Sequence, residues 1–301
     1  MIDVIAILCS DIHLSDKCPV ARSMDADWFL AMKESLGELS QLQRENDCPV
    51  LFAGDLFDKW KSSPRLINFA LVNLPNEMYC IPGQHDLPMH NLDSIEDGAY
   101  WTLVEAGKIC DLSFGSKSHH FPSFSVYGFP WGKKIESLFE KEQQKTLKVC
   151  LVHQYVWKEG CSFPGVSNDS NVKNAAQEVR NYDVAVFGDN HKGFIDRRKG
   201  RTLLNCGSFM KRAADQVKYH PRVGLLLADG TVKQYRLKTK QQVSRKHLKK
   251  KKEQMDLSEV LNEVKGLQNS DLDFRVAVLR YLEDKKVDSL TKKCILEALE
   301  E

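Results

Sequence analysis

The sequence lacks several features that would place it in a specialised class of protein. None of its apolar runs approaches the roughly 20 residues of a membrane-spanning helix, so no membrane contact is expected. Neither sign of charge dominates: 43 basic and 41 acidic side chains give a net charge of +2. This balance argues against a nucleic-acid coat protein, so any DNA contact must be local. No internal repeat is visible. The first eight residues are apolar but have no basic leader, and we interpret them as a strand rather than a signal peptide.

The nine cysteines form neither a disulfide framework nor a zinc-finger pattern. Their number is odd, and no two are spaced as Cys-x-x-Cys. Cys9, Cys150 and Cys206 lie in or beside apolar, strand-like runs. Reduced, buried thiols in a cytosolic protein are therefore predicted. The expected location is the cytoplasm, which would be the host cytoplasm if the protein is viral.

The 301 residues have an ordinary globular composition, with 42% hydrophobic and 28% charged residues. Six short apolar runs are typical of buried strands: residues 4–8, 50–53, 78–81, 149–152, 184–187 and 202–204. Amphipathic helices are predicted at about 27–43 and from Pro64, with Ser63 as N-cap. This alternation of strands and helices predicts an α/β fold with parallel strands, in which ligands gather at the carboxyl ends of the strands.

The C-terminal part of the sequence differs in character. Residues 222–237 predict a hairpin that turns at Asp229-Gly230. A basic stretch at 245–252 precedes amphipathic helical segments that begin at Asp256. We therefore predict one domain at 1–240, a basic linker at 241–254 and a small helical domain at 255–301.

Aspartate and histidine follow five of the predicted strands in turn. The clusters are Asp11-Ile-His13, Gly54-Asp55-Leu-Phe-Asp58, Gly83-Gln84-His85-Asp86, His153, and Gly188-Asp189-Asn190-His191. Taken alone, Asp11 fits a turn or helix cap and His153 a hydrogen-bonded structural histidine. Together they concentrate oxygen and nitrogen ligands at one sheet edge, a mixture that suits Mn²⁺, Fe or Zn.

This ordered set resembles the signature of the calcineurin-like metallophosphoesterase superfamily over about residues 1–235. The resemblance implies a four-layer α/β/β/α sandwich, to which this chain adds the small C-terminal helical unit, and a centre for two divalent metal ions. It implies that Asp11, His13 and His191 bind one ion, that Asp55 bridges both, and that Gln84, His153 and Asp189 bind the second. His85 matches the family's catalytic histidine, which protonates the leaving oxygen or stabilises the transition state, and Asp86 would orient its ring. Asp58 is expected to support the loop that presents Asp55.

Two positions depart from the family pattern, and both concern the second ion. Gln84 replaces an asparagine, and Asp189 replaces the first histidine of Gly-His-x-His. Either the harder ligand set favours Mn²⁺ or Mg²⁺ over zinc, or the second ion binds weakly. We hypothesise that the longer amide and the shorter carboxylate compensate for each other.

Within the superfamily, the chain resembles the SbcD-type nuclease subunits of recombination and repair complexes, especially their phage relatives. The residues that carry this likeness are 81–88, 127–132 and 205–212. It implies a Mn²⁺-dependent exonuclease and endonuclease that cleaves DNA by a two-metal mechanism. It also implies a homodimer that pairs with an SMC-like ABC ATPase of the SbcC type. The C-terminal helices would dock on that ATPase, or alternatively pack only on their own core.

Several residues are candidates for contacts with the substrate. Lys192, Lys211 and Arg212 are candidates for phosphate contacts, and Trp131, Tyr155 and Trp157 for base stacking, although Trp131 also fits a packed loop anchor. Two other functions compete with the nuclease. One is a phosphatase or cyclic-nucleotide phosphodiesterase, which would need a closed pocket. The other is a non-catalytic scaffold, which would have no need of His85.

Overall fold

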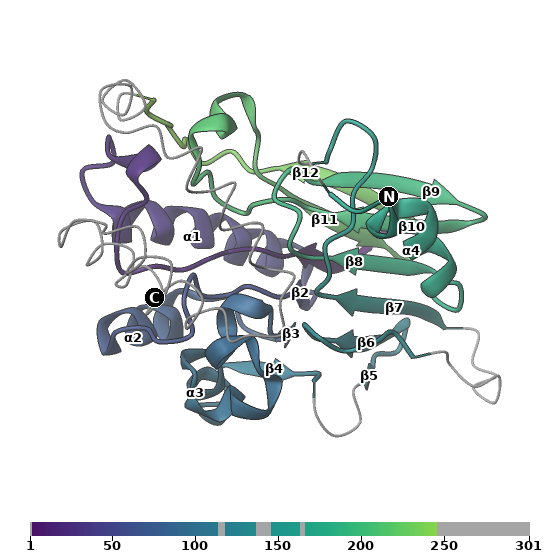
Figure 1. Cartoon of the computed structure of the whole chain (residues 1–301). Helices are drawn as coiled ribbons and strands as arrows, with labels where there is room; N and C mark the ends of the chain where they lie inside the picture. The colour runs from purple at the N-terminus through teal and green to yellow at the C-terminus, as the bar shows by residue number, and fades with distance from the viewer. Residues whose placement is uncertain (1, 114–117, 137–145, 163–165, 246–301) are drawn as a thin grey trace, which may run out of the picture. The chain divides into compact units, whose positions relative to one another are not determined.

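The computed structural model of the protein describes residues 2–113, 118–136, 146–162 and 166–245. These residues form two six-stranded sheets with helices outside them (Figure 1). The predicted helical domain at 255–301 lies outside the described residues, as does most of the linker at 241–254.

The first sheet has the strand order β12-β11-β1-β2-β3-β4. Four of its strands run parallel: β1 (Val4–Cys9), β2 (Val50–Ala53), β3 (Met78–Ile81) and β4 (Ile109–Asp111). The predicted hairpin forms the other edge, where β11 (Arg222–Leu227) pairs antiparallel with both β1 and β12 (Val232–Arg236).

The second sheet has the order β5-β6-β7-β8-β10-β9. Its parallel centre consists of β6 (Phe124–Phe129), β7 (Leu147–Val152), β8 (Val184–Phe187) and β10 (Arg201–Asn205). The edge strands β5 (Ser118–His120) and β9 (Phe194–Arg198) are antiparallel to their neighbours.

Side-chain caps explain where the two predicted helices begin. The Asp27 side chain accepts from the Leu30 amide before α1 (Trp28–Asn46), and Ser63 does the same for Leu66 before α2 (Pro64–Asn73). The two shorter α-helices are α3 (Ala99–Glu105) and α4 (Val172–Glu178). Short 3₁₀ turns are η1 (Val20–Arg22), η2 (Gln84–Asp86), η3 (Pro88–His90), η4 (Leu92–Asp97), η5 (Asn168–Ser170) and η6 (Ala214–Lys218).

Three apolar clusters define four layers. One lies between the first sheet and helices α1 to α3, and includes Leu36 and Phe52. A second lies between the two sheets, with Leu8 and Leu151. The third lies between the second sheet and α4, with Ala175 and Phe187. The predicted α/β/β/α sandwich is thereby confirmed. In the described part of the chain no helix is both long and apolar enough to span a membrane.

The topology places the candidate residues together. Because β1, β2 and β3 are parallel neighbours, the loops after them meet at one edge of the first sheet. The loops that follow β7 and β8 meet in the same way in the second sheet. Hydrogen bonds join these loops, since Asp11 N donates to Gly54 O and Asp189 N donates to Asp11 Oδ1.

Candidate metal centre

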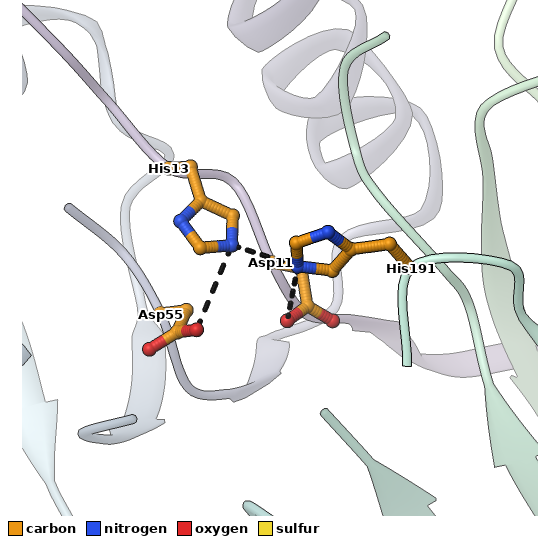
Figure 2. Close-up of side chains that lie close together, drawn as sticks. All are labelled: Asp11, His13, Asp55 and His191. Carbon is orange, nitrogen blue, oxygen red and sulfur yellow. Dashed lines mark hydrogen bonds and ion pairs between the residues drawn. The ribbon is translucent and has the colours of Figure 1, made fainter. Parts of the chain in front are cut away.

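Four of the predicted ligands form one compact cluster. Asp11, His13, Asp55 and His191 each offer a nitrogen or carboxylate oxygen, and these atoms lie within 4.8 Å of one another. His13 Nε2 lies 3.0 Å from His191 Nε2 and 3.6 Å from Asp55 Oδ2, and His191 Nε2 lies 3.7 Å from Asp11 Oδ1 (Figure 2). Two imidazoles and two carboxylates at these separations match the donor set of a divalent transition metal.

Asp55 lies between this cluster and a second group of ligands. Its Oδ2 atom is 3.6 Å from His13 Nε2 on one side and 3.5 Å from His153 Nε2 on the other. Its Oδ1 atom accepts a hydrogen bond of 2.9 Å from the His85 amide, which fixes the carboxylate plane. A single oxygen flanked by two histidines is where a carboxylate shared by two metal ions would lie.

Buried polar atoms without a partner show that the residues fit such ions. Among the described residues, Asp55 Oδ2, Gln84 Oε1 and His153 Nε2 are buried and accept or donate no hydrogen bond. His153 Nδ1 lies 2.7 Å from the Ala53 carbonyl, so Nδ1 donates this hydrogen bond and Nε2 is the atom that would bind an ion once its proton is lost. Leaving such atoms unsatisfied is costly, and divalent ions would satisfy them.

The sequence also matches a family model. The model described as calcineurin-like phosphoesterase matches residues 6–193, which is more than half of the chain. The chain belongs to the calcineurin-like phosphoesterase family. A comparison with curated proteins returns no match.

The structure of this calcineurin-like phosphoesterase is similar to several solved structures. A protein of Thermus thermophilus is 12% identical, with 78% of this chain and 99% of that one covered at a TM-score of 0.45. A novel archaeal phosphodiesterase is 13% identical, with 77% and 99% covered and a TM-score of 0.40. The phosphopantetheinyl hydrolase of Mycobacterium tuberculosis is 12% identical, with 69% and 90% covered and a TM-score of 0.39.

The backbone at the centre adopts conformations that side chains rarely take. Asp11, His13, Asp55 and Asp189 have φ values of 55°, 50°, 61° and 71°. Each costs on the order of 1–3 kcal/mol and persists only where the surroundings enforce it, as they do at functional sites. Glycine permits the close approach nearby, because a Cβ at Gly83 would lie 2.1 Å from Asp55 Oδ1.

Burial sets the ionisation of the metal-free site. It is the largest influence on Asp11 and raises the pKa of this carboxyl group to about 8, assisted by the charge of Asp55. Burial also opposes ionisation of Asp55, but the neighbouring His153 and His13 hold the Asp55 pKa below its usual range. For His153, burial lowers the pKa, yet the Asp55 carboxylate raises it overall to about 10. Protons on Asp11 and His153 thus take the place of bound cations in the metal-free site.

His85 lies at the centre, but Asp86 does not orient its ring as expected. His85 Nδ1 is 2.9 Å from the Asp58 carbonyl oxygen, which only accepts, so Nδ1 is the donor. The buried Asp86 carboxylate instead accepts from the backbone amides of Leu56, Phe57 and Gly83, at 3.1, 2.8 and 2.9 Å. Asp86 therefore ties together the loops that present Asp55 and His85, and Asp58 holds the His85 ring.

Two of the three side chains expected to contact phosphate donate hydrogen bonds to backbone carbonyls. Lys192 Nζ donates to the Ser162 carbonyl, and Lys211 Nζ donates to the Val217 carbonyl at 3.0 Å. Arg212 does lie at the centre, where its Nη2 is 2.6 Å from Asp58 Oδ1 and its Nη1 donates to the His13 carbonyl. Its guanidinium group therefore fixes two residues of the site.

The structure reveals other cations next to the centre. A cleft of about 620 Å³ is bordered by His153 and Trp131, whose ring centroids are 6.4 Å apart, and by Lys133, Lys134 and Arg180. These three cations were not predicted from the sequence. Lys133 and Lys134 lie two and three positions after Trp131, so the sequence alone could have indicated them as phosphate contacts. Arg180 is far from Trp131 in the sequence, and only the fold brings it to the cleft. Trp157 lies apart from this cleft and donates from Nε1 to the Ser167 carbonyl at 2.8 Å.

Proposed function

We propose that this calcineurin-like phosphoesterase is a metal-dependent DNA nuclease of the SbcD type, which hydrolyses phosphodiester bonds with two divalent ions. The cleft beside His153 is the observation that carries the nucleic-acid part of the proposal. A small ester would require an enclosing pocket, whereas this cleft has exposed lysines along one wall. It is lined by three cations, one carboxylate (Glu178) and an indole ring.

That combination matches how proteins bind single strands. Cationic side chains follow the phosphate backbone, and aromatic rings stack on bases, by about 1–3 kcal/mol for each base. Trp131 is half-buried beside His153, so a base stacked on its exposed part would lie close to a phosphate at the metal centre. A continuous strand could then extend away along Lys133, Lys134 and Arg180.

The ligands and His85 would have separate roles in the reaction. Asp11, His13 and His191 would hold one ion, Gln84, His153 and Asp189 the other, and Asp55 both. When bound, the two ions would lower the pKa of a water molecule and neutralise phosphate charge. Because Nδ1 of His85 donates to the Asp58 carbonyl, Nε2 is the atom that would give a proton to the leaving oxygen.

The kind of metal and the assembly belong to the same proposal. Carboxylate and amide oxygens at the second position support Mn²⁺, with Mg²⁺ as the alternative, because these ions favour oxygen ligands. We further propose a homodimer that pairs with an SMC-like ABC ATPase through the predicted helices at 255–301, which lie outside the described residues.

The test compares two substrates under matched metal conditions. An end-labelled linear duplex and bis-p-nitrophenyl phosphate are incubated with Mn²⁺, Mg²⁺ or EDTA, using the wild type and His85→Ala. We expect DNA degradation that requires Mn²⁺ and His85. Cleavage of the small ester without cleavage of DNA, even with the ATPase supplied, would favour a small-molecule phosphodiesterase. If neither is cleaved although metal binds, the scaffold interpretation replaces the enzyme.

A further inference from the structure

A second basic pocket lies between α4 and the β9–β10 hairpin. It has a volume of about 360 Å³ and is lined by Lys173, Ala176 and Gln177 of α4 and by Arg198, Lys199 and Arg201 of the β9–β10 hairpin. Four of these six residues are cationic and none is acidic. In a chain with a net charge of only +2, such a concentration of one sign is local and specific.

These positive charges destabilise the β9–β10 hairpin that carries three of them. Arg198 and Arg201 are directly opposite each other in the ladder, and like charges in that position are destabilising. The two residues between them, Lys199 and Gly200, have φ values of 50° and 77°, which indicate a type I′ turn. Asn, Asp or Gly normally occupies the first position of such a turn, so a lysine there is a further unfavourable choice.

Little within the described part of the chain neutralises the group. Asp196 is ion-paired with Arg198, but it also pairs with Lys158 at 2.9 Å. No acceptor among the described residues pairs with the side chains of Lys173, Lys199 or Arg201. An external polyanion would relieve the repulsion that the fold leaves in place.

The helix connects this pocket to the cleft at the metal centre. Lys173, Ala176 and Gln177 line the pocket, while Glu178 and Arg180, at and just beyond the end of the same helix, line the cleft. Figure 1 shows α4 beside the ends of β9 and β10. The seven residues of α4 span about 10 Å, over which one strand of duplex DNA carries about three phosphates.

We propose that Lys173, Arg198, Lys199 and Arg201 form a second, non-catalytic site for the DNA phosphate backbone, which receives the strand that leaves the cleft over α4. This inference rests on the proposed nuclease function. Its ligand is the phosphodiester backbone itself, so binding at this site would be independent of base sequence and of the metal ions.

The test removes charge without straining the fold. In Lys173→Gln/Lys199→Asn, two positive charges disappear and the turn gains the residue that it favours. The matched control, Lys33→Gln/Arg44→Gln, removes two exposed charges from α1. Binding of a linear duplex is measured by fluorescence anisotropy in EDTA over a range of salt concentrations, alongside thermal stability and bis-p-nitrophenyl phosphate hydrolysis in Mn²⁺.

We expect the α4–hairpin variant to bind DNA about tenfold more weakly at low salt, with a salt slope less negative by about 1.8 than that of the wild type. Its melting temperature should equal or exceed that of the control, because the turn gains a favoured residue, and its small-ester hydrolysis should match that of the control. Equal affinity and equal slope in the two variants would overturn the second site while leaving the nuclease intact. A wild type that neither binds nor degrades DNA would overturn the site together with the proposed function.

Discussion

The side-chain amide of Gln84 donates a hydrogen bond of 2.9 Å to Asp189 Oδ1, across 105 positions of sequence. A carboxylate only accepts, so the amide nitrogen must be the atom that contacts it, and the amide oxygen is turned away. That oxygen, Oε1, is buried and has no partner among the described residues. The two departures from the family pattern therefore form one unit, in which Asp189 orients Gln84 so that its oxygen is available as a ligand.

Removing the Gln84 amide should weaken only the second metal position. For Gln84→Ala we expect the affinity for the second Mn²⁺ to fall about 10- to 100-fold, because one ligand is lost and Asp189 loses its hydrogen-bond partner. Isothermal titration with Mn²⁺ would measure both sites. The double variant Gln84→Ala/Asp189→Ala should lose less affinity than the sum of the losses in the two single variants, since the two side chains are in contact. Two ions bound to Gln84→Ala with wild-type affinity would refute the pairing.

His85 should matter most where the leaving group needs a proton. We expect His85→Ala to lower the rate of DNA cleavage by about 10²- to 10⁴-fold. Hydrolysis of bis-p-nitrophenyl phosphate should fall much less, because its leaving group departs as an anion. The number of bound metal ions should not change, since the contact with Asp55 comes from the His85 backbone. The matched control is His120→Ala, which removes an exposed histidine. Equal losses on both substrates would contradict a proton-donor role.

Asp86 should affect stability rather than proton transfer. In Asp86→Asn the amide group can no longer accept from all three backbone amides of Leu56, Phe57 and Gly83. The loss of at least one buried hydrogen bond should lower the free energy of unfolding by about 1–3 kcal/mol. Urea denaturation of the metal-free protein measures this, with exposed Asp93→Asn as the control. An Asp86→Asn variant that kept full stability but lost activity would show instead that Asp86 acts on the His85 ring.

The sequence predicted the elements whose signals are local. All six predicted strands are present, α1 begins close to its predicted start, and α2 begins after its predicted cap, Ser63, because an apolar run or a capping serine needs no distant residue to be recognised. Strands β4, β5, β6 and β9 and the short helices α3 and α4 were missed, since such elements depend on packing against their neighbours more than on a local signal.

At the site, the order of the motifs predicted which residues meet, but it could not predict the partner of each atom. The expected contact between Asp86 and the His85 ring is wrong because the Asp58 carbonyl occupies that position. The hydrogen bonds from Lys192 and Lys211 to backbone carbonyls could not be predicted for the same reason, since these carbonyls become neighbours only in the folded chain.

Metal binding should strengthen with pH because Asp11 must first lose a proton. Burial, the largest influence, and the charge of Asp55 raise the Asp11 pKa to about 8 in the metal-free fold. Because the Asp11 pKa is higher in the folded state than in the unfolded state, protonation of Asp11 stabilises the metal-free folded protein at low pH. This contribution is lost as the pH rises through about 8. A bound cation takes the place of that proton.

We therefore expect Mn²⁺ to raise the melting temperature more at about pH 8 than at about pH 6, and each binding event near pH 7 to release protons. Differential scanning fluorimetry with Mn²⁺ or EDTA at each pH measures the first effect. Calorimetric titration in buffers of different ionisation enthalpy measures the second. Asp11→Asn, which has no proton to release, should show a smaller proton release and a flatter pH dependence. A wild-type protein stabilised equally at both pH values would mean that Asp11 is already ionised before the metal binds.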